Sequence, residues 1–238
     1  RDASDFGTTP GIDKSVHQSQ FVEPEPNKVL VSLGQHPLHR AMVLFDADWL
    51  NETERYDDFS DGLSQWSVFS YYKGIVGHCG YNRTAGCSLK DGKLNIQYIE
   101  NDSLLTSQRG AVWNFPAFRK GRFTASVRFN NVDSNAELLL NDRWFNPSDT
   151  VARHFASFVI PLNPKKLKIK DSKAHTLRIE WNLDTKKPEA IVYVDNKKRM
   201  TIPLTNSSLH GLSYVHFLSD NRAGDQGYVV EGVNAEKM

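Results

Sequence analysis

The sequence predicts an all-β protein, because strand-like patterns recur through most of the chain and no long amphipathic helical pattern interrupts them. The strongest pattern lies between residues 175 and 204, where three strand-like runs are separated only by polar turns. In the first run Leu177, Ile179 and Trp181 alternate with polar residues, which indicates a strand with one buried and one solvated face. The same alternation between residues 122 and 129 predicts a strand in the middle of a sheet.

Further strands are expected from similar runs bounded by turn-forming residues. They are Trp66–Tyr71, Lys93–Ile99, Ala111–Phe115, Ala136–Asn141, His154–Ile160, Gly211–Leu218 and Gly227–Asn234. Residues 1–40 differ, because they are polar, contain proline and show no sustained period. We expect them to form an irregular N-terminal leader that can supply one strand, at residues 28–33. Residues 41–238 would then form a single β-sandwich domain.

The meander also carries a family resemblance. A strand ending in Trp181, a polar turn, a strand ending in Val194 and Asp195, a Lys-rich turn and a short strand follow one another. This order resembles the concanavalin A-like jelly rolls, also called laminin-G-like sandwiches, and implies a two-sheet antiparallel β-sandwich. The wider stretch 111–218 looks like the sandwich domain that accompanies six-bladed sialidase-like propellers in secreted bacterial glycosidases. The resemblance therefore implies a secreted protein, a glycan or polysaccharide as partner, and a catalytic propeller domain as a further partner.

Composition excludes some other classes of function. The chain has 29 Lys and Arg against 28 Asp and Glu, for a formal net charge of +1, so no overall field would attract nucleic acid. No apolar run approaches the roughly 18 residues that a membrane-spanning helix needs, and no membrane span is expected. The thirteen Phe, eight Tyr and five Trp are enough for a large core or for platforms on which sugars stack, and composition does not separate these uses.

The two cysteines, Cys79 and Cys87, lie in a stretch rich in turn-forming residues. A local disulfide between them is our first expectation for a secreted protein. Free buried thiols and a metal site completed by His78 are the alternatives, although zinc usually has four ligands.

Acidic residues near both ends of the expected sandwich suggest a calcium site. Sandwiches of this resemblance pair their first and last strands, which would bring Asp57 and Asp58 close to Glu231. Ca²⁺ takes six to eight oxygen ligands, and carboxylates are common among them. The alternative is a turn in which the Asp side chains accept hydrogen bonds from backbone amides.

A polar and aromatic loop after the apolar strand 136–141 is the candidate glycan site. Trp144 would stack on the C–H face of a pyranose ring, and neighbouring polar groups would bind its hydroxyls. These polar groups are Asp142, Arg143, Asn146 and, across the sheet, His154. The alternative is a corner in which Trp144 closes one end of the core and Arg143 pairs with Asp142 or Asp149.

The sequence contains no recognisable catalytic motif. Retaining glycosidases need two carboxylates about 5 to 5.5 Å apart. Glu137 and Asp142 are five residues apart, which places them on opposite faces of a regular strand. We therefore predict a non-catalytic carbohydrate-binding or accessory domain of a carbohydrate-active enzyme. The alternatives are a stand-alone glycoside hydrolase or polysaccharide lyase, and a structural or protein-interaction module.

Overall fold

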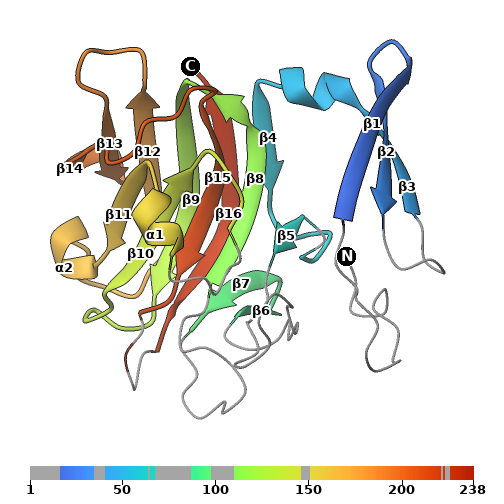
Figure 1. Cartoon of the computed structure of the whole chain (residues 1–238). Coiled ribbons are helices and arrows are strands. Elements are labelled where there is room, and N and C mark those ends of the chain that lie inside the picture. The colour runs from blue at the N-terminus through green and yellow to red at the C-terminus, as the bar shows by residue number, and fades with distance from the viewer. Residues whose placement is uncertain are drawn as a thin grey trace. The chain divides into compact units, whose positions relative to one another are not determined.

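The chain forms two compact units, Arg1–Glu52 and Thr53–Met238. A computed structural model describes residues 17–34, 41–63, 65–67, 87–97, 110–145, 151–220, 222 and 226–238. Each unit has β-sheet of its own (Figure 1).

The N-terminal unit contains a three-stranded antiparallel sheet. Its strands are β1 (His17–Glu25), β2 (Lys28–Gly34) and β3 (Ala41–Asp46), with β2 in the centre. Asn27 in the β1–β2 turn has a φ of 62°, and its amide donates to the Glu23 carboxylate at 3.0 Å. A short 3-10 helix, η2 (Ala47–Asn51), follows β3. The leader thus supplies two strands, β1 and β2, and β2 pairs with β3 of the segment that follows the leader.

The second unit is a sandwich of two antiparallel sheets, as the sequence predicts. Among the described residues the larger sheet has the order β14-β13-β12-β9-β16-β7-β6, and β4 also pairs with β16. Its strands are β4 (Glu54–Asp57), β6 (Cys87–Lys90), β7 (Lys93–Ile96), β9 (Lys120–Phe129), β12 (His175–Asn182), β13 (Glu189–Val194), β14 (Lys197–Pro203) and β16 (Tyr228–Lys237). The smaller sheet has the order β11-β10-β15-β8-β5. Its strands are β5 (Trp66–Ser67), β8 (Gly110–Phe118), β10 (Ala136–Asn141), β11 (Phe158–Leu162) and β15 (Leu212–Leu218).

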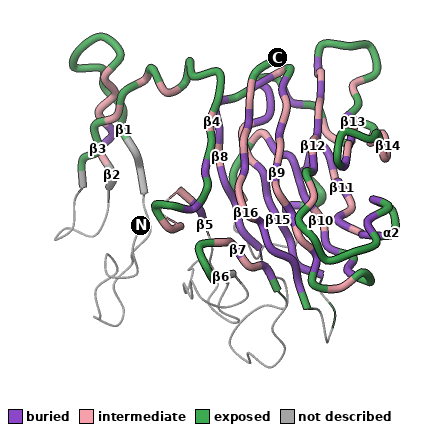
Figure 2. The backbone as a smooth tube through the Cα atoms, turned by 180° about the vertical axis from the view of Figure 1, so that it is seen from behind, coloured by how far each residue is buried: buried purple, intermediate pink, exposed green. Residues whose placement is uncertain are grey.

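The core lies between the two sheets and follows the predicted alternation. On β9, Phe123, Ala125, Val127 and Phe129 are all buried, and the residues between them face away from the core. β9 lies between β12 and β16, which confirms that it is a central strand. Trp181 is also in the core, where its indole N–H donates to the carbonyl oxygen of Phe118 at 3.0 Å. Figure 2 shows that buried residues follow the strands of the sandwich and exposed residues gather at their turns.

One expected strand is wrong in its first half. The prediction was a strand over His154–Ile160, but the structure has a helical turn, α1 (Ala152–Phe155), and then β11 from Phe158. The physical reason is local. Ala152 and Ala156 are four residues apart and both buried, which is a helical spacing, whereas the residues between them are exposed. A second helical turn, α2 (Pro164–Leu167), follows β11 and is capped by Asn163.

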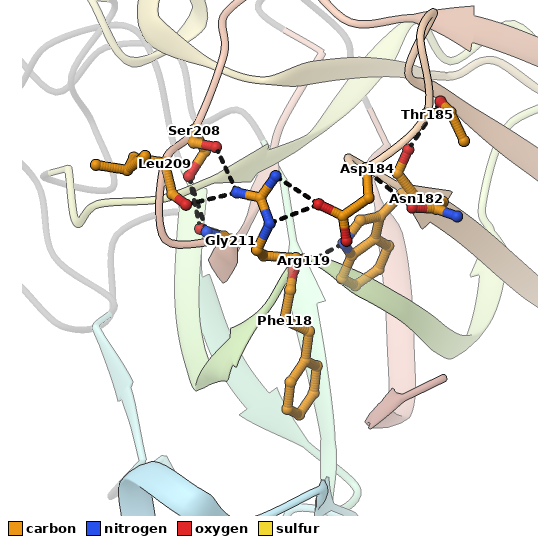
Figure 3. A network of polar contacts seen from close by, with 9 residues as sticks. Phe118, Arg119, Asn182, Asp184, Thr185, Ser208, Leu209 and Gly211 are labelled. Carbon is orange, nitrogen blue, oxygen red and sulfur yellow. Dashed lines mark hydrogen bonds and ion pairs between the residues drawn. The ribbon is translucent and has the colours of Figure 1, made fainter.

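Arg119 stabilises the corner between β8 and β9, where the chain passes from the smaller sheet to the larger one. Its guanidinium pairs with the Asp184 carboxylate at 2.6 Å and also donates to the carbonyl oxygens of Ser208 and Leu209 (Figure 3). Next to it, Gly211 has a φ of 105°, and a Cβ there would lie 2.6 Å from the carbonyl carbon of Phe118. The corner between β8 and β9, the β12–β13 turn and the loop after β14 are therefore held together by one side chain.

Candidate functional site

The candidate site lies on the outer face of the smaller sheet, which we define as the side that points away from the core. Leu138 and Leu140 of β10 point into the core, so Asn141, one residue further, faces outward. Asn141 pairs with Tyr214 of β15, and Tyr214 pairs in turn with Asn114 of β8. A row of three polar side chains therefore crosses the three middle strands of this sheet, and Asn141 in that row is buried.

The loop after β10 places Trp144 beside this row. The Trp144 indole N–H donates to the Ser67 hydroxyl of β5 at 3.2 Å. β5 lies three strands away from β10 in the sheet, so the loop crosses the outer face to make this contact. Trp144 remains 45% exposed, which is unusual for a side chain with so much apolar surface. The ring is thus held by a hydrogen bond and is still open to solvent.

The polar groups next to Trp144 bind each other. The Arg143 guanidinium donates to both oxygens of the Asp142 carboxylate, at 2.7 and 3.1 Å. This hydrogen bonding is the main reason that the pKa of Asp142 lies below its usual value, and the Ser208 hydroxyl contributes. Because Arg143 is largely exposed, the pair presents N–H donors to solvent while its carboxylate is mostly covered.

Helix α1 covers the other end of the same face. Ala152 and Ala156 pack against Leu139 and Leu218, which point outward from β10 and β15. The side-chain amide of Asn206 donates to the carbonyl oxygens of His154 and Ala156, both at 2.9 Å, and so holds the end of the helix.

A stacked aromatic pair joins this helix to the Trp144 loop. The rings of Phe145 and Phe155 lie 5.8 Å apart at an interplanar angle of 20°. Phe155 is also well exposed. The stacked pair therefore links the loop that carries Trp144 to α1.

Four of the five residues predicted for the glycan site can be placed, and three of these are adjacent. Trp144, Asp142 and Arg143 are together in the loop after β10. His154 lies on α1, and its side chain is exposed. Its backbone carbonyl, not its ring, accepts a hydrogen bond from the Asn206 amide. Asn146 lies outside the described residues. Of the corner interpretation, the pairing of Arg143 with Asp142 is present, whereas Trp144 is too exposed to close the core.

The three predicted calcium ligands each have protein partners, and calcium binding stays a prediction. The first and last strands of the sandwich do pair, with Asp57 opposite Val233. Asp57, however, is buried and uses its two oxygens on the Phe59 amide and the Trp66 indole, both at 2.7 Å. Within the part of the chain that the structure describes, no group of three or more His, Cys, Asp or Glu side chains could hold a metal ion.

The other two predicted ligands also have other partners. Asp58 accepts the Ser60 amide at 3.0 Å, as in the turn that we considered as the alternative. Glu231 pairs with Lys93 at 2.7 Å and accepts from the Ser126 hydroxyl at 3.3 Å. The disulfide remains a prediction, because Cys79 lies outside the described residues and the side chain of Cys87, at the start of β6, is not described.

The two carboxylates considered for catalysis each have an arginine partner. Glu137 pairs with Arg153 of α1 at 3.1 Å, while Asp142 binds Arg143. Burial raises the pKa of Glu137, against the opposing charges of Arg153 and Lys166. The pKa values of the two carboxylates thus shift in opposite directions, a property often seen at functional sites.

Sequence reasoning missed the contributions of β15, β8 and β5 to this face. Tyr214, Asn114 and Ser67 come from strands that are distant in sequence. The signal for Tyr214 was present, because it alternates with Val215 and Phe217, which are in the core. Burial raises the pKa of the Tyr214 hydroxyl above its usual value.

Comparison with known proteins places the fold in a wider context. No protein-family model and no curated protein matches the sequence. The structure is similar to a sialidase with a TM-score of 0.53 and 13% identity, over 89% of this chain and 21% of the sialidase. This chain therefore spans about a fifth of that relative.

Two glucan-degrading enzymes are also similar in structure. An endo-1,3-beta-glucanase from Streptomyces sioyaensis has a TM-score of 0.48 and 14% identity, over 79% of this chain and 97% of the enzyme. A laminarinase from Rhodothermus marinus has a TM-score of 0.48 and 14% identity, over 78% of this chain and 97% of the enzyme. At such identities the likeness concerns the fold alone.

Proposed function

We propose that Thr53–Met238 is a non-catalytic glycan-binding module that serves a secreted carbohydrate-active enzyme. The observation that supports this most is Trp144, an exposed indole ring whose orientation is held by Ser67. A ring that is already ordered loses little conformational entropy when a sugar stacks on it. The exposed guanidinium of Arg143 supplies donors for hydroxyl groups beside the ring. Binding of this kind is shallow and weak at one site, and attachment to an enzyme adds avidity.

The pairing of the carboxylates favours binding over hydrolysis. A retaining hydrolase needs one carboxylate free to attack and one that gives up a proton. In the structure Glu137 and Asp142 each pair with an arginine. A stand-alone glycoside hydrolase or lyase is the second candidate, and the raised pKa of Glu137 is the observation in its favour. Turnover of a glycan by the isolated chain, abolished in Glu137→Gln, would establish that candidate instead.

The proposed partner is a glycan or polysaccharide, and the proposed setting is a longer enzyme with a catalytic propeller domain. The sialidase similarity supports the setting, because a comparable fold there occupies only part of a longer chain. No helix in the described part of the chain is both long and apolar enough to cross a membrane.

The decisive experiment is affinity electrophoresis of the full chain against a panel of neutral and acidic polysaccharides. Trp144→Ala should weaken binding about tenfold, the equivalent of roughly 1.4 kcal/mol for one stacked ring. The matched control is Val132→Ala, because Val132 is 44% exposed and lies in the β9–β10 turn. Equal retardation of Trp144→Ala and wild type, with unchanged circular dichroism, would refute glycan binding at this loop.

A further inference from the structure

The three-stranded sheet of the N-terminal unit carries apolar side chains on both faces. Its register aligns residues of the three strands in cross-strand rows, and neighbouring rows point to opposite faces. One row is Phe21, Val31 and Val43, and the next is Val22, Leu30 and Leu44. Neither row contains a charged or polar side chain, so each face of this sheet carries an apolar row, and on the face of Val22 the flanking positions include Gln20, Ser32 and the Lys28–Asp46 ion pair.

Large apolar side chains on both faces are exposed. Phe21 on one face is 68% exposed, and Leu44 on the other is 59% exposed. Single exposed apolar residues are ordinary on protein surfaces, but an adjoining set on each side of one sheet is not. In the sandwich, by contrast, β9 alternates buried apolar with polar outward residues. A continuous apolar run such as Met42 to Phe45 is the pattern of a strand covered on both sides.

We propose that β1, β2 and β3 form an inner layer of a larger β domain, in which an antiparallel sheet packs against each face. Sheets are the favoured occupants because helices cover both faces mainly of parallel sheets, whereas antiparallel sheets stack face to face about 10 Å apart. A second copy of this chain is a poorer occupant, because a two-fold dimer buries the same face of both copies and leaves the other face exposed.

The sialidase similarity supports an occupant within one longer polypeptide. The match covers 89% of this chain, which is more than Thr53–Met238 contains, so it extends into Arg1–Glu52. Part of the N-terminal unit is therefore matched there together with the sandwich, within a chain of which this one spans 21%. This inference concerns how the module is attached and is independent of glycan binding at Trp144.

Hydrogen exchange tests the inference. The experiment compares the 238-residue chain with an extended polypeptide, which is encoded by the same natural reading frame continued upstream of Arg1. The amides of Leu30 and Val31, in the central strand, should exchange at least 100-fold more slowly in the extended polypeptide. The Val127 amide in β9 is the internal control and should exchange equally in both. Equal exchange of β2 in the two polypeptides, or a reading frame with no β domain upstream, would overturn the inference.

One charged substitution on each face distinguishes two covered faces from one. Phe21→Glu and Leu44→Glu should each restore fast exchange of β2 in the extended polypeptide and leave the melting temperature of the 238-residue sandwich unchanged. If only one of the two variants speeds the exchange of β2, only one face is covered. That result would indicate an ordinary two-layer packing and refute the inner layer. If β2 of the 238-residue chain becomes more protected as protein concentration rises, and light scattering shows a dimer, the occupant is a second copy. That result would also refute the inner layer.

Discussion

The indole nitrogen of Trp66 lies 2.7 Å from Oδ2 of Asp57, and both side chains are less than a tenth exposed. The other carboxylate oxygen of Asp57 accepts the Phe59 amide at 2.7 Å. The Trp66 ring in turn packs against Phe59 and Trp113, with centroids 5.3 and 6.0 Å apart. One buried carboxylate therefore joins the end of β4, the following turn and the tryptophan of β5.

Asp57→Ala should destabilise the sandwich by about 3 kcal/mol, because two buried donors lose a charged acceptor. Asp58→Ala is the matched control, since Asp58 is exposed and accepts the Ser60 amide in a similar turn. The control should cost less than about 1 kcal/mol. Urea unfolding followed by tryptophan fluorescence measures both. Equal losses in the two variants, or a melting temperature of wild type that rises with added calcium, would contradict this account of Asp57.

Gly211→Ala should be among the most damaging small substitutions in the chain. The new Cβ would lie 2.6 Å from the backbone of Phe118, at a φ of 105°. Strain of this kind costs on the order of 1–3 kcal/mol, and the clash with backbone adds to it. Gly92→Ala is the control, because Gly92 also has a positive φ, 69°, but its Cβ would meet nothing within 4 Å. Thermal unfolding should show a clearly larger loss of stability for Gly211→Ala than for Gly92→Ala. Similar losses of stability in the two variants would mean that the backbone around Arg119 can move to accommodate the new Cβ.

The sequence predicted what depends on local pattern and missed what depends on distant pairing. β10 and the alternation of β9 were predictable because burial on one face imposes period two on neighbouring residues. Trp144 was also a local choice, as an aromatic residue in a polar loop, and its binding of a glycan stays a prediction. The row of Asn114, Tyr214 and Asn141 joins three strands far apart in sequence, and their register is a tertiary property.

The proposed calcium site shows the same limit. Pairing of the first and last strands was expected and is present. The hydrogen bonds that decide the function of each carboxylate were not readable from sequence, because they join Asp57 to Trp66 inside the core and Glu231 to Lys93 on the polar face.

His175 should make the stability of the sandwich depend on pH near neutrality. Its ring nitrogens lie 2.7 Å from Asp195 and 3.0 Å from Asp171. Burial lowers the pKa of His175, but the two carboxylates outweigh burial and the pKa is raised overall. The stabilisation is therefore complete below about pH 6.5, the usual value for histidine, and is lost as pH rises through the raised pKa.

The measurement is the free energy of unfolding of wild type and His175→Gln from pH 4 to pH 9. The loss in the variant should be largest at about pH 5 to 6, where histidine is charged and both aspartates are ionised. It should shrink above pH 7. Because the pKa values of Asp171 and Asp195 are lowered, their share of the stabilisation persists until the pH falls below about 4. A difference that is flat with pH, or that grows above pH 7, would show that the histidine is not charged in this pair.

Glu137 provides a prediction of the opposite sign. Burial raises the pKa of its carboxyl, so the ionised form is less favourable in the folded protein than in the unfolded chain. Glu137→Gln should therefore stabilise the sandwich at pH 7, and the gain should vanish as pH falls below about 4, where the unfolded chain also binds the proton. Arg153 is largely exposed, so water can replace its lost partner.

Arg153→Met is the companion variant and should lower stability at pH 7. It removes the charge that opposes the burial of Glu137, so the pKa of Glu137 should rise further. A carboxylate such as Glu137 that lowers stability is expected to persist where its charge serves a function. Functional sites are often less stable than they could be. Chemical unfolding at pH 7 and pH 3.5 measures both variants. Loss of stability in Glu137→Gln at pH 7 would mean that the ion pair with Arg153 outweighs burial, and that this carboxylate is a structural part of the α1 contact.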